Sequence, residues 1–287
     1  MPTIYSGCEW FCHEAVDNAT ENLNLLVFMS ELTVLWGVVG FLGASIGSFL
    51  TLVTYRLPRE EKIGLSRSRC PRCLRDLQLL DLIPILSWAA SRGRCRHCKT
   101  HISIRYPLTE LMTMLGTLGA VYLFGFTLPG LAVAGLWWCI VAIIVTDLEH
   151  YIILDEVQIA IILFGVMFHY ALGSDFQEVI VSAIIGLVAG LVLKYGFLYL
   201  RNKDGLGMGD VKLLFGVGVW LANPTSFVPF LFFAGVLGVV CGLLWRVAGL
   251  GKVFPFGPAL AVSLLVCTVW PQAMDHFWQL YMVTTVA

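Results

Sequence analysis

The chain has 287 residues, of which 58% are hydrophobic and 13% are charged, and its formal net charge is −1. A soluble domain is about half apolar and roughly a quarter charged, so this composition excludes an ordinary soluble protein. The sequence predicts an all-α polytopic membrane protein. We therefore expect a lipid bilayer as its surroundings and no nucleic-acid partner.

Apolar segments predict about eight transmembrane helices, because each span needs about 20 residues. The segments lie at roughly 26–54, 107–125, 129–146, 157–172, 178–200, 211–222, 226–245 and 255–272, and the sixth is short. We expect four regions: a periplasmic tail (1–24), helix 1 (25–55), a cytoplasmic loop domain (56–106) and a seven-helix domain (107–287). The tail lacks a basic region, so helix 1 is expected to be retained and not cleaved as a signal peptide.

Basic residues are concentrated in one segment. Twelve of the eighteen Lys and Arg residues lie between Arg56 and Arg105, and residues 1–55 contain none. Lys and Arg beside membrane spans mark the cytoplasmic side. The segment 56–105 is therefore predicted to be cytoplasmic and the N-terminus periplasmic. We expect the short segment 211–222 to cross the membrane, because this crossing keeps the later basic residues on the cytoplasmic side.

Cysteines in this basic segment predict a metal site. Two C-x2-C pairs are separated by twenty-one residues: Cys70, Cys73, Cys95 and Cys98. This spacing suits tetrahedral zinc, and four sulfur ligands would make the ion structural. The alternative is that these cysteines form disulfides or remain free thiols. A reducing cytosol disfavours the disulfides. Outside the membrane, Cys8 and Cys12 could pair or stay free.

Two aspartates are predicted at the same membrane boundary. Asp147 follows the apolar run LWWCIVAIIV, and Asp210 precedes the short sixth span. Two carboxylates face to face cannot both ionise cheaply, so such a pair shares one proton. It can then deprotonate a water while protonating a leaving amide, as in aspartic proteolysis. The alternative is that DGLGMGD is a turn in which Asp210 only caps a helix.

Neighbouring residues are candidates for supporting roles. Gly207 and Gly209 lack a Cβ, so another segment or a substrate could approach closely around Asp210. Lys212 could pair with Asp210 or a nearby acid, or anchor its helix at the interface. Glu110, at the start of the second span, could be a structural partner for loop arginines or have a functional role.

Four sequence blocks carry a family resemblance. GMGDVKLL resembles the GxGD motif of membrane aspartyl proteases. From about residue 37 onward the chain resembles the type IV prepilin peptidases. The blocks are GSFLTLVTYRLP (47–58), the two knuckles with RGRCRHC and ISIRYPLTEL, TDLEHYIILD, and GMGDVKLL.

The resemblance implies a bacterial inner-membrane enzyme of type IV pili and type II secretion. Such enzymes cut the basic leader from prepilins and pseudopilins after a glycine, on the cytoplasmic side. They commonly methylate the new N-terminal amine with S-adenosylmethionine. Asp147 and Asp210 then match the catalytic aspartates. Asp155 is a supporting candidate, because Ile153-Leu154-Asp155 replaces the usual Leu-Pro-Asp.

The part of the chain that the resemblance associates with methylation matches the family pattern less completely. Thr51 and Asp81 stand where the family usually has asparagine, and no residues for the methyl donor can be identified from the sequence. Acids near the aspartates could attract a basic leader: Glu149, Asp155, Glu156 and Asp204.

Two other classes of protein compete with a peptidase. An ion-coupled transporter would use Asp147 and Asp210 to relay protons, but transporters usually place such acids at mid-membrane in broken helices. A noncatalytic zinc-containing scaffold of a secretion assembly would need the cysteines and tolerate loss of both acids.

Overall fold

The computed structural model describes residues 6–61, 63, 68–70, 72–202, 205–251 and 254–272, with side chains from residue 29 onward. Those residues are almost entirely helical, and β-pairing among them is limited to two isolated bridges, Arg69 with Asp76 and Arg94 with His101. The prediction of an all-α chain is confirmed. The side chains of Cys8 and Cys12 lie outside the described residues.

Nine α-helices and three short 3-10 helices follow one another in the described residues. They are α1 (Ser6–Arg56), η1 (Leu57–Arg59), η2 (Leu79–Leu82), α2 (Leu86–Ala90), α3 (Arg105–Phe124), α4 (Leu128–His150), α5 (Asp155–Leu172), α6 (Phe176–Arg201), α7 (Met208–Leu221), η3 (Pro224–Ser226), α8 (Phe227–Val247) and α9 (Gly257–Val269).

Six helical segments in the described chain are long and apolar enough to cross a bilayer. They are Met29–Arg59, Arg105–Phe124, Leu128–His150, Asp155–Leu172, Phe176–Arg201 and Pro224–Val247. The other two expected spans coincide with α7 and α9, which have 14 and 13 residues. The class of polytopic membrane protein is thus confirmed, and the number of eight spans stays a prediction.

The turn between α4 and α5 is tight, and it follows directly from the residues at the end of α4. Tyr151 adopts a left-handed conformation with φ of 57°, and its N–H donates to the carbonyl of Asp147. A residue with positive φ stops a helix, because its carbonyl and side chain leave the helical path. Asp147 therefore lies in the last turn of α4, immediately before the connection to α5.

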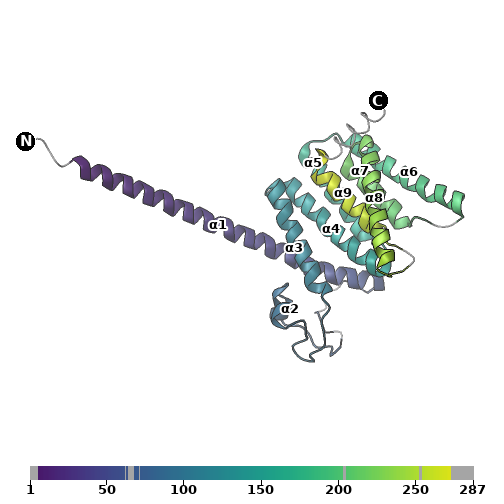
Figure 1. The fold of residues 1–287 in the computed structure, drawn as a ribbon, viewed down its shortest axis with the longest axis horizontal. Coiled ribbons are helices and arrows are strands. Elements are labelled where there is room, and N and C mark those ends of the chain that lie inside the picture. The colour runs from purple at the N-terminus through teal and green to yellow at the C-terminus, as the bar shows by residue number, and fades with distance from the viewer. Residues whose placement is uncertain are drawn as a thin grey trace, which may run out of the picture.

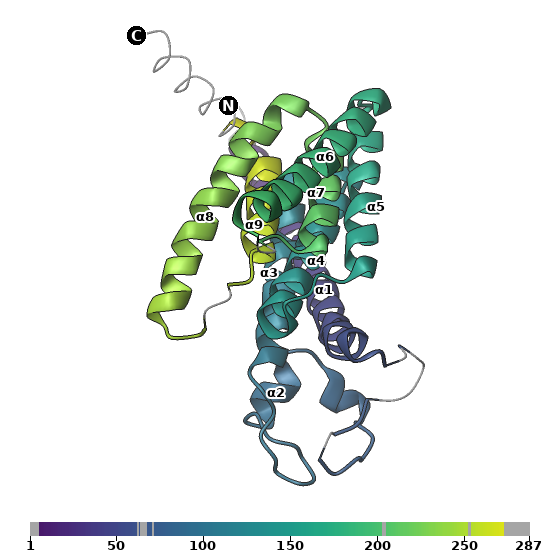
Figure 2. The same ribbon diagram turned by 90° about the vertical axis from the view of Figure 1, so that its right-hand side faces the viewer.

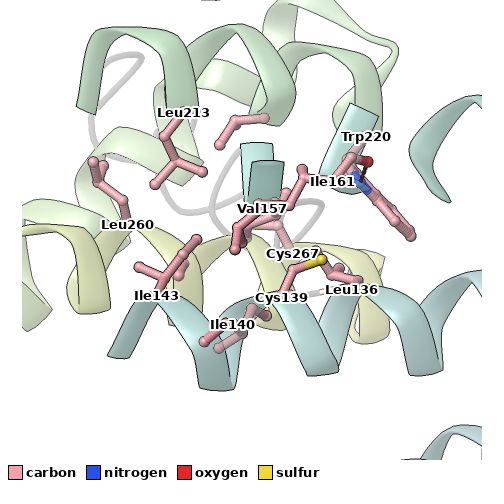
Figure 3. Packing of buried hydrophobic residues seen from close by; sticks show 14 of the residues in the cluster. Leu136, Cys139, Ile140, Ile143, Val157, Ile161, Leu213, Trp220, Leu260 and Cys267 are labelled. Atoms are coloured by element: carbon pink, nitrogen blue, oxygen red, sulfur yellow. Dashed lines mark hydrogen bonds between the residues drawn. The ribbon is translucent and has the colours of Figure 1, made fainter. Parts of the chain in front are cut away.

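The core is built around α4. Leu136, Ile140 and Ile143 of this helix are completely buried. Figure 3 shows them together with Leu260 of α9 and Val157 of α5. Because lipid is as apolar as leucine, burial alone does not hold such helices together, and close packing and hydrogen bonds do. The end of α4 that carries Asp147 is thus fixed by its neighbours.

Helix α7 packs between α5 and α6. The indole Nε1 of Trp220 donates to the carbonyl of Ile161 at 2.9 Å, and His169 Nε2 lies 3.0 Å from the carbonyl of Trp220. On the other side, a Cβ on Gly218 would collide with the backbone of α6 at Ser182 and Ala183. These contacts fix the helix that begins beside Asp210.

The membrane helices form a bundle from which α1 extends far to one side (Figure 1). The C-terminal part of α1 lies along α3, and the segment between these two helices forms a separate small lobe that carries α2 (Figures 1 and 2). This lobe lies beyond the ends of α1 and α3 and corresponds to the expected loop domain.

Candidate active site and metal centre

Asp147 is held by the first residue of α9. Its side chain is 6% exposed, and its Oδ2 accepts a hydrogen bond from the backbone N–H of Gly257 at 2.9 Å. The first N–H groups of a helix have no partner within the helix, so they are available to bind a carboxylate. The start of α9 therefore orients one oxygen of Asp147, although 110 residues separate the two positions.

Asp210 is held by its own helix start. It is the third residue of α7, and its Oδ2 accepts a hydrogen bond from the backbone N–H of Gly207 at 3.2 Å. The side chain is half-buried. Asp210 does cap the beginning of α7, as the alternative interpretation of the sequence required. Capping uses Oδ2, and Oδ1 accepts no hydrogen bond from the described part of the chain.

The backbone segments that hold Asp147 and Asp210 share one neighbouring side chain. Ile153, in the turn after α4, packs against Gly257, which binds Asp147, and against Gly209, which precedes Asp210. Its Cβ lies 3.3 Å from the position that a Cβ on Gly209 would take, and its Cδ1 lies 3.0 Å from that of Gly257. The segments that hold the two aspartates thus meet at Ile153.

Gln158 is a polar residue at this site that sequence reasoning missed. It lies in α5, is buried, and its Nε2 donates to the carbonyl of Gly209 at 3.2 Å. Its Oε1 has no hydrogen-bond partner among the described residues. The available signal was an amide on an otherwise apolar helix, one turn after Asp155. Gln158 fixes the backbone directly before Asp210.

Lys212 pairs with Asp155 and not with Asp210. Its Nζ lies 2.7 Å and 2.9 Å from the two carboxylate oxygens of Asp155. Both side chains are well exposed, so solvent screening limits this ion pair to about 1 kcal/mol or less. The ion pair joins the start of α5 to the start of α7.

Glu110 binds a backbone amide, whereas a loop arginine was one of the partners considered from the sequence. Among the described residues, its Oε2 accepts a hydrogen bond from the N–H of Ile85 at 2.7 Å. The arginine that begins α3, Arg105, instead reaches Glu149 of α4 at 3.0 Å and Thr54 of α1 at 2.7 Å. Glu110 thus attaches the loop domain to α3, and Arg105 joins three membrane helices.

The four loop cysteines converge on one point, and each of their sulfur atoms lies within 4.8 Å of the others. Cys70 Sγ and Cys98 Sγ are 3.8 Å apart. Zinc–sulfur bonds of about 2.3 Å in a tetrahedron also place sulfur atoms about 3.8 Å apart, so the cluster fits a metal ion.

The two C-x2-C turns have the same backbone structure. Cys70 N–H donates to Arg75 and Cys95 N–H donates to Thr100, while Leu74 and Lys99 adopt left-handed φ values of 55° and 56°. Such paired knuckles present four sulfur ligands to one ion.

The two residues that depart from the family pattern have local structural roles. Thr51 is buried in α1, and its hydroxyl donates to the carbonyl of Ser48 at 2.7 Å. Asp81 accepts a hydrogen bond from the N–H of Gln78 at 3.1 Å and pairs with Arg96 at 3.2 Å. Of the acids expected to attract a basic leader, Asp204 lies outside the described residues.

Comparisons with known proteins identify the family to which this chain belongs. The model of the bacterial peptidase A24 N-terminal domain matches residues 41–124, and that of the type IV leader peptidase family matches residues 133–243. The first segment contains the cysteine cluster, and the second contains Asp147 and Asp210.

Curated relatives cover most of the chain. A prepilin leader peptidase/N-methyltransferase of Pectobacterium carotovorum is 34% identical over 79% of this chain and 90% of the relative. Proteins of the same name from Aeromonas salmonicida and Pseudomonas aeruginosa are 32% and 30% identical over 81% and 80% of this chain, and over 90% and 88% of the relatives. No solved structure gives a significant match. The chain belongs to the type IV leader peptidase family, so the resemblance inferred from its motifs is confirmed.

Proposed function

We propose that this protein is a membrane aspartyl endopeptidase that removes the basic leader of type IV prepilins and pseudopilins after a glycine. The observation that carries the proposal is the pair Asp147 and Asp210, which converge from α4 and α7 and are each oriented by a backbone amide. Membership of the leader peptidase family supports the same reaction.

The geometry of the pair suits general acid and base chemistry. In each carboxyl group, Oδ2 is occupied by a backbone N–H, which leaves Oδ1 for water or substrate. With one proton shared, the ionised carboxylate takes a proton from water as the water oxygen attacks the scissile carbonyl carbon. The protonated carboxyl group then gives its proton to the leaving amide nitrogen as the carbon–nitrogen bond breaks.

The position of the site suits a substrate that is half in the membrane. A prepilin combines a basic leader with an apolar helix, so its scissile bond would lie at the bilayer interface. Both aspartates lie at helix ends. At the start of α5, Glu156 is exposed, as is Asp155, which pairs with Lys212. Negative charge at this position would attract the leader.

The proposed topology places this site on the cytoplasmic face of the bacterial inner membrane. All eight helices α1 and α3 to α9 would cross, including the short α7 and α9. The basic loop domain would then lie on the side that the positive-inside rule assigns to the cytoplasm, with the N-terminus in the periplasm. A buried position for α7 supports its crossing, because α5 and α6 cover it.

The cysteine cluster is proposed to hold one structural zinc ion. Cys70, Cys73, Cys95 and Cys98 would be its ligands, and the bound ion would supply folding energy to a lobe without a core of its own. Neighbouring His97 is not required, since its Nδ1 lies 3.0 Å from Arg75 Nη1.

N-methylation of the new amino terminus is a second proposed activity, and the names of the relatives support it. S-adenosylmethionine would supply the methyl group. An open hollow in the described part of the loop domain is lined by basic side chains. Its charge does not fit a sulfonium cation, so we do not assign the methyl donor to it.

Mass spectrometry of a candidate pilin tests both activities. Incubation of the full prepilin with the purified protein is expected to release the leader, with cleavage after a glycine. In the presence of S-adenosylmethionine, the mature product should gain the mass of one methyl group in place of a hydrogen. An uncleaved prepilin would refute the peptidase, and a cleaved product without the added mass would refute the methyltransferase alone.

Replacement of Gly257 by alanine tests the support of Asp147. The new Cβ would lie 2.7 Å from Asp147 Oδ2 and 3.0 Å from Ile153 Cδ1, so the carboxylate must move. We expect kcat for prepilin cleavage to fall about tenfold or more with little change in KM, because a shift in barrier of only about 1.4 kcal/mol has this effect. Gly235→Ala in α8 is the matched control, since a Cβ there meets open space. Equal kcat values for the two variants would contradict the role of Gly257.

A further inference from the structure

Several leucines of the loop domain are exposed in one short segment. In η2 and α2, the exposed fractions are 86% for Leu79, 60% for Leu80 and 67% for Leu86. Soluble surfaces rarely expose large apolar side chains in such groups, and grouped exposure marks a surface that contacts lipid or protein. These three leucines therefore lack a covering partner within the described chain.

The hydrogen bond between Ile85 and Glu110 fixes the depth of this segment. Glu110 lies five residues after the start of α3, which corresponds to about 8 Å along the helix axis. Helix α3 has 20 residues, or about 30 Å, which only just spans the hydrocarbon core. The N–H of Ile85 donates to Glu110 Oε2 at 2.7 Å, and side chains on a helix point back toward its start, so Ile85 lies close to the N-terminal end of α3. Leu86, the next residue, is thus at the level of the bilayer boundary.

A basic hollow adjoins the leucines. It has a volume of about 600 Å³ and is lined by Ala90, Ser91, Arg92, Arg94, Arg96 and Lys99. Helix α2 leads from Leu86 directly to the hollow at Ala90. The ion pair of Arg96 Nε with Asp81 Oδ1, at 3.2 Å, joins the hollow to η2. The hollow has four cationic side chains in its lining and one neighbouring carboxylate, that of Asp81, so it carries excess positive charge.

We propose that the segment 79–86 inserts its leucines into the leaflet where α1 ends and α3 begins, and that the adjoining hollow binds the phosphate of an anionic phospholipid. Apolar side chains beside arginines are the combination that holds peripheral segments at a membrane interface. The loop domain then rests on the membrane surface, with its cysteine cluster beside the helix ends. This inference rests on the membrane-spanning fold and not on the peptidase reaction.

Photocrosslinking measures whether the leucines contact lipid. Benzoylphenylalanine replaces Leu79, Leu80 or Leu86 in separate full-length variants, which are reconstituted in nanodiscs of phosphatidylethanolamine and phosphatidylglycerol and illuminated. The control carries the same group at Leu74, which is 71% exposed in the first cysteine knuckle. We expect the intact mass to show lipid adducts several-fold more often at each test position than at position 74. Adducts at or below the level of the control would overturn the insertion.

Native mass spectrometry measures the headgroup site. Arg92→Gln combined with Arg94→Gln removes two charges from the hollow. Arg72→Gln combined with Arg75→Gln removes two charges from the same loop domain outside the hollow. We expect the first variant to retain several-fold less phosphatidylglycerol than the second, with zinc content unchanged in both. Equal retention of phosphatidylglycerol by the two variants would show that lipid binding depends only on net charge. This result would overturn the proposed phosphate site in the hollow.

Discussion

Prepilin cleavage is expected to be lost when Asp147 or Asp210 is replaced singly by asparagine. Asparagine keeps the size of the side chain and can still accept the hydrogen bond of Gly257 or Gly207, but it cannot carry the shared proton. General acid or base catalysis contributes about 10²- to 10⁴-fold to a rate, so either variant should lose at least that factor. Immunoblots for the precursor and mature pilin in co-expressing cells provide the measurement, with kcat on purified protein to quantify it.

Asp175→Asn is the matched control for these variants. Asp175 caps the start of α6, where its Oδ1 accepts from the N–H of Gln177 at 2.9 Å. Asparagine caps helices as well as aspartate does, so this variant should process prepilin normally. Continued processing by Asp147→Asn or Asp210→Asn would reject the catalytic pair.

Loss of the metal is expected to unfold the loop domain while the membrane helices remain intact. Cys70→Ser with Cys98→Ser removes two of the four sulfur ligands, one from each knuckle. Structural zinc sites bind with about 10 to 16 kcal/mol, which is more than the stability of most small lobes. The wild-type protein should contain about one zinc ion per chain, and the variant close to none. Limited proteolysis should then cleave the variant between α1 and α3.

Cys241→Ser serves as the control for the metal experiment. Cys241 lies exposed on α8, far along the chain from both knuckles, so its replacement should leave the zinc content unchanged. Elemental analysis of detergent-purified protein provides the metal count. Wild-type protein that is free of metal, resists proteolysis in the loop and still cleaves prepilin would contradict a structural zinc ion.

The sequence predicted those features that depend on local composition. Each of the eight apolar segments contains a helix, and the regular C-x2-C spacing predicted four sulfur atoms that meet. The paired aspartates could be predicted because an alternating topology places the end of one span and the start of another at the same boundary. Their catalytic role came from the family resemblance as well, and it stays a proposal.

Other parts of the site could not be predicted, because they depend on tertiary packing between distant segments. Gly257 is 110 residues from Asp147, and nothing in its local sequence distinguishes its N–H as the donor to that carboxylate. The partner of Glu110 could not be predicted for a related reason. Charge suggested an arginine, whereas the described structure supplies the amide of Ile85, which no side-chain pattern can indicate.

The ion pair of Arg105 and Glu149 has a consequence for how the two halves of this protein can vary. Arg105 belongs to the segment matched by the N-terminal domain model, and Glu149 belongs to the segment matched by the leader peptidase model. Glu149 is two residues beyond Asp147. A chimera that takes its halves from different relatives must therefore inherit compatible charges at both positions, or an uncompensated ion will be left at the seam, two residues from Asp147.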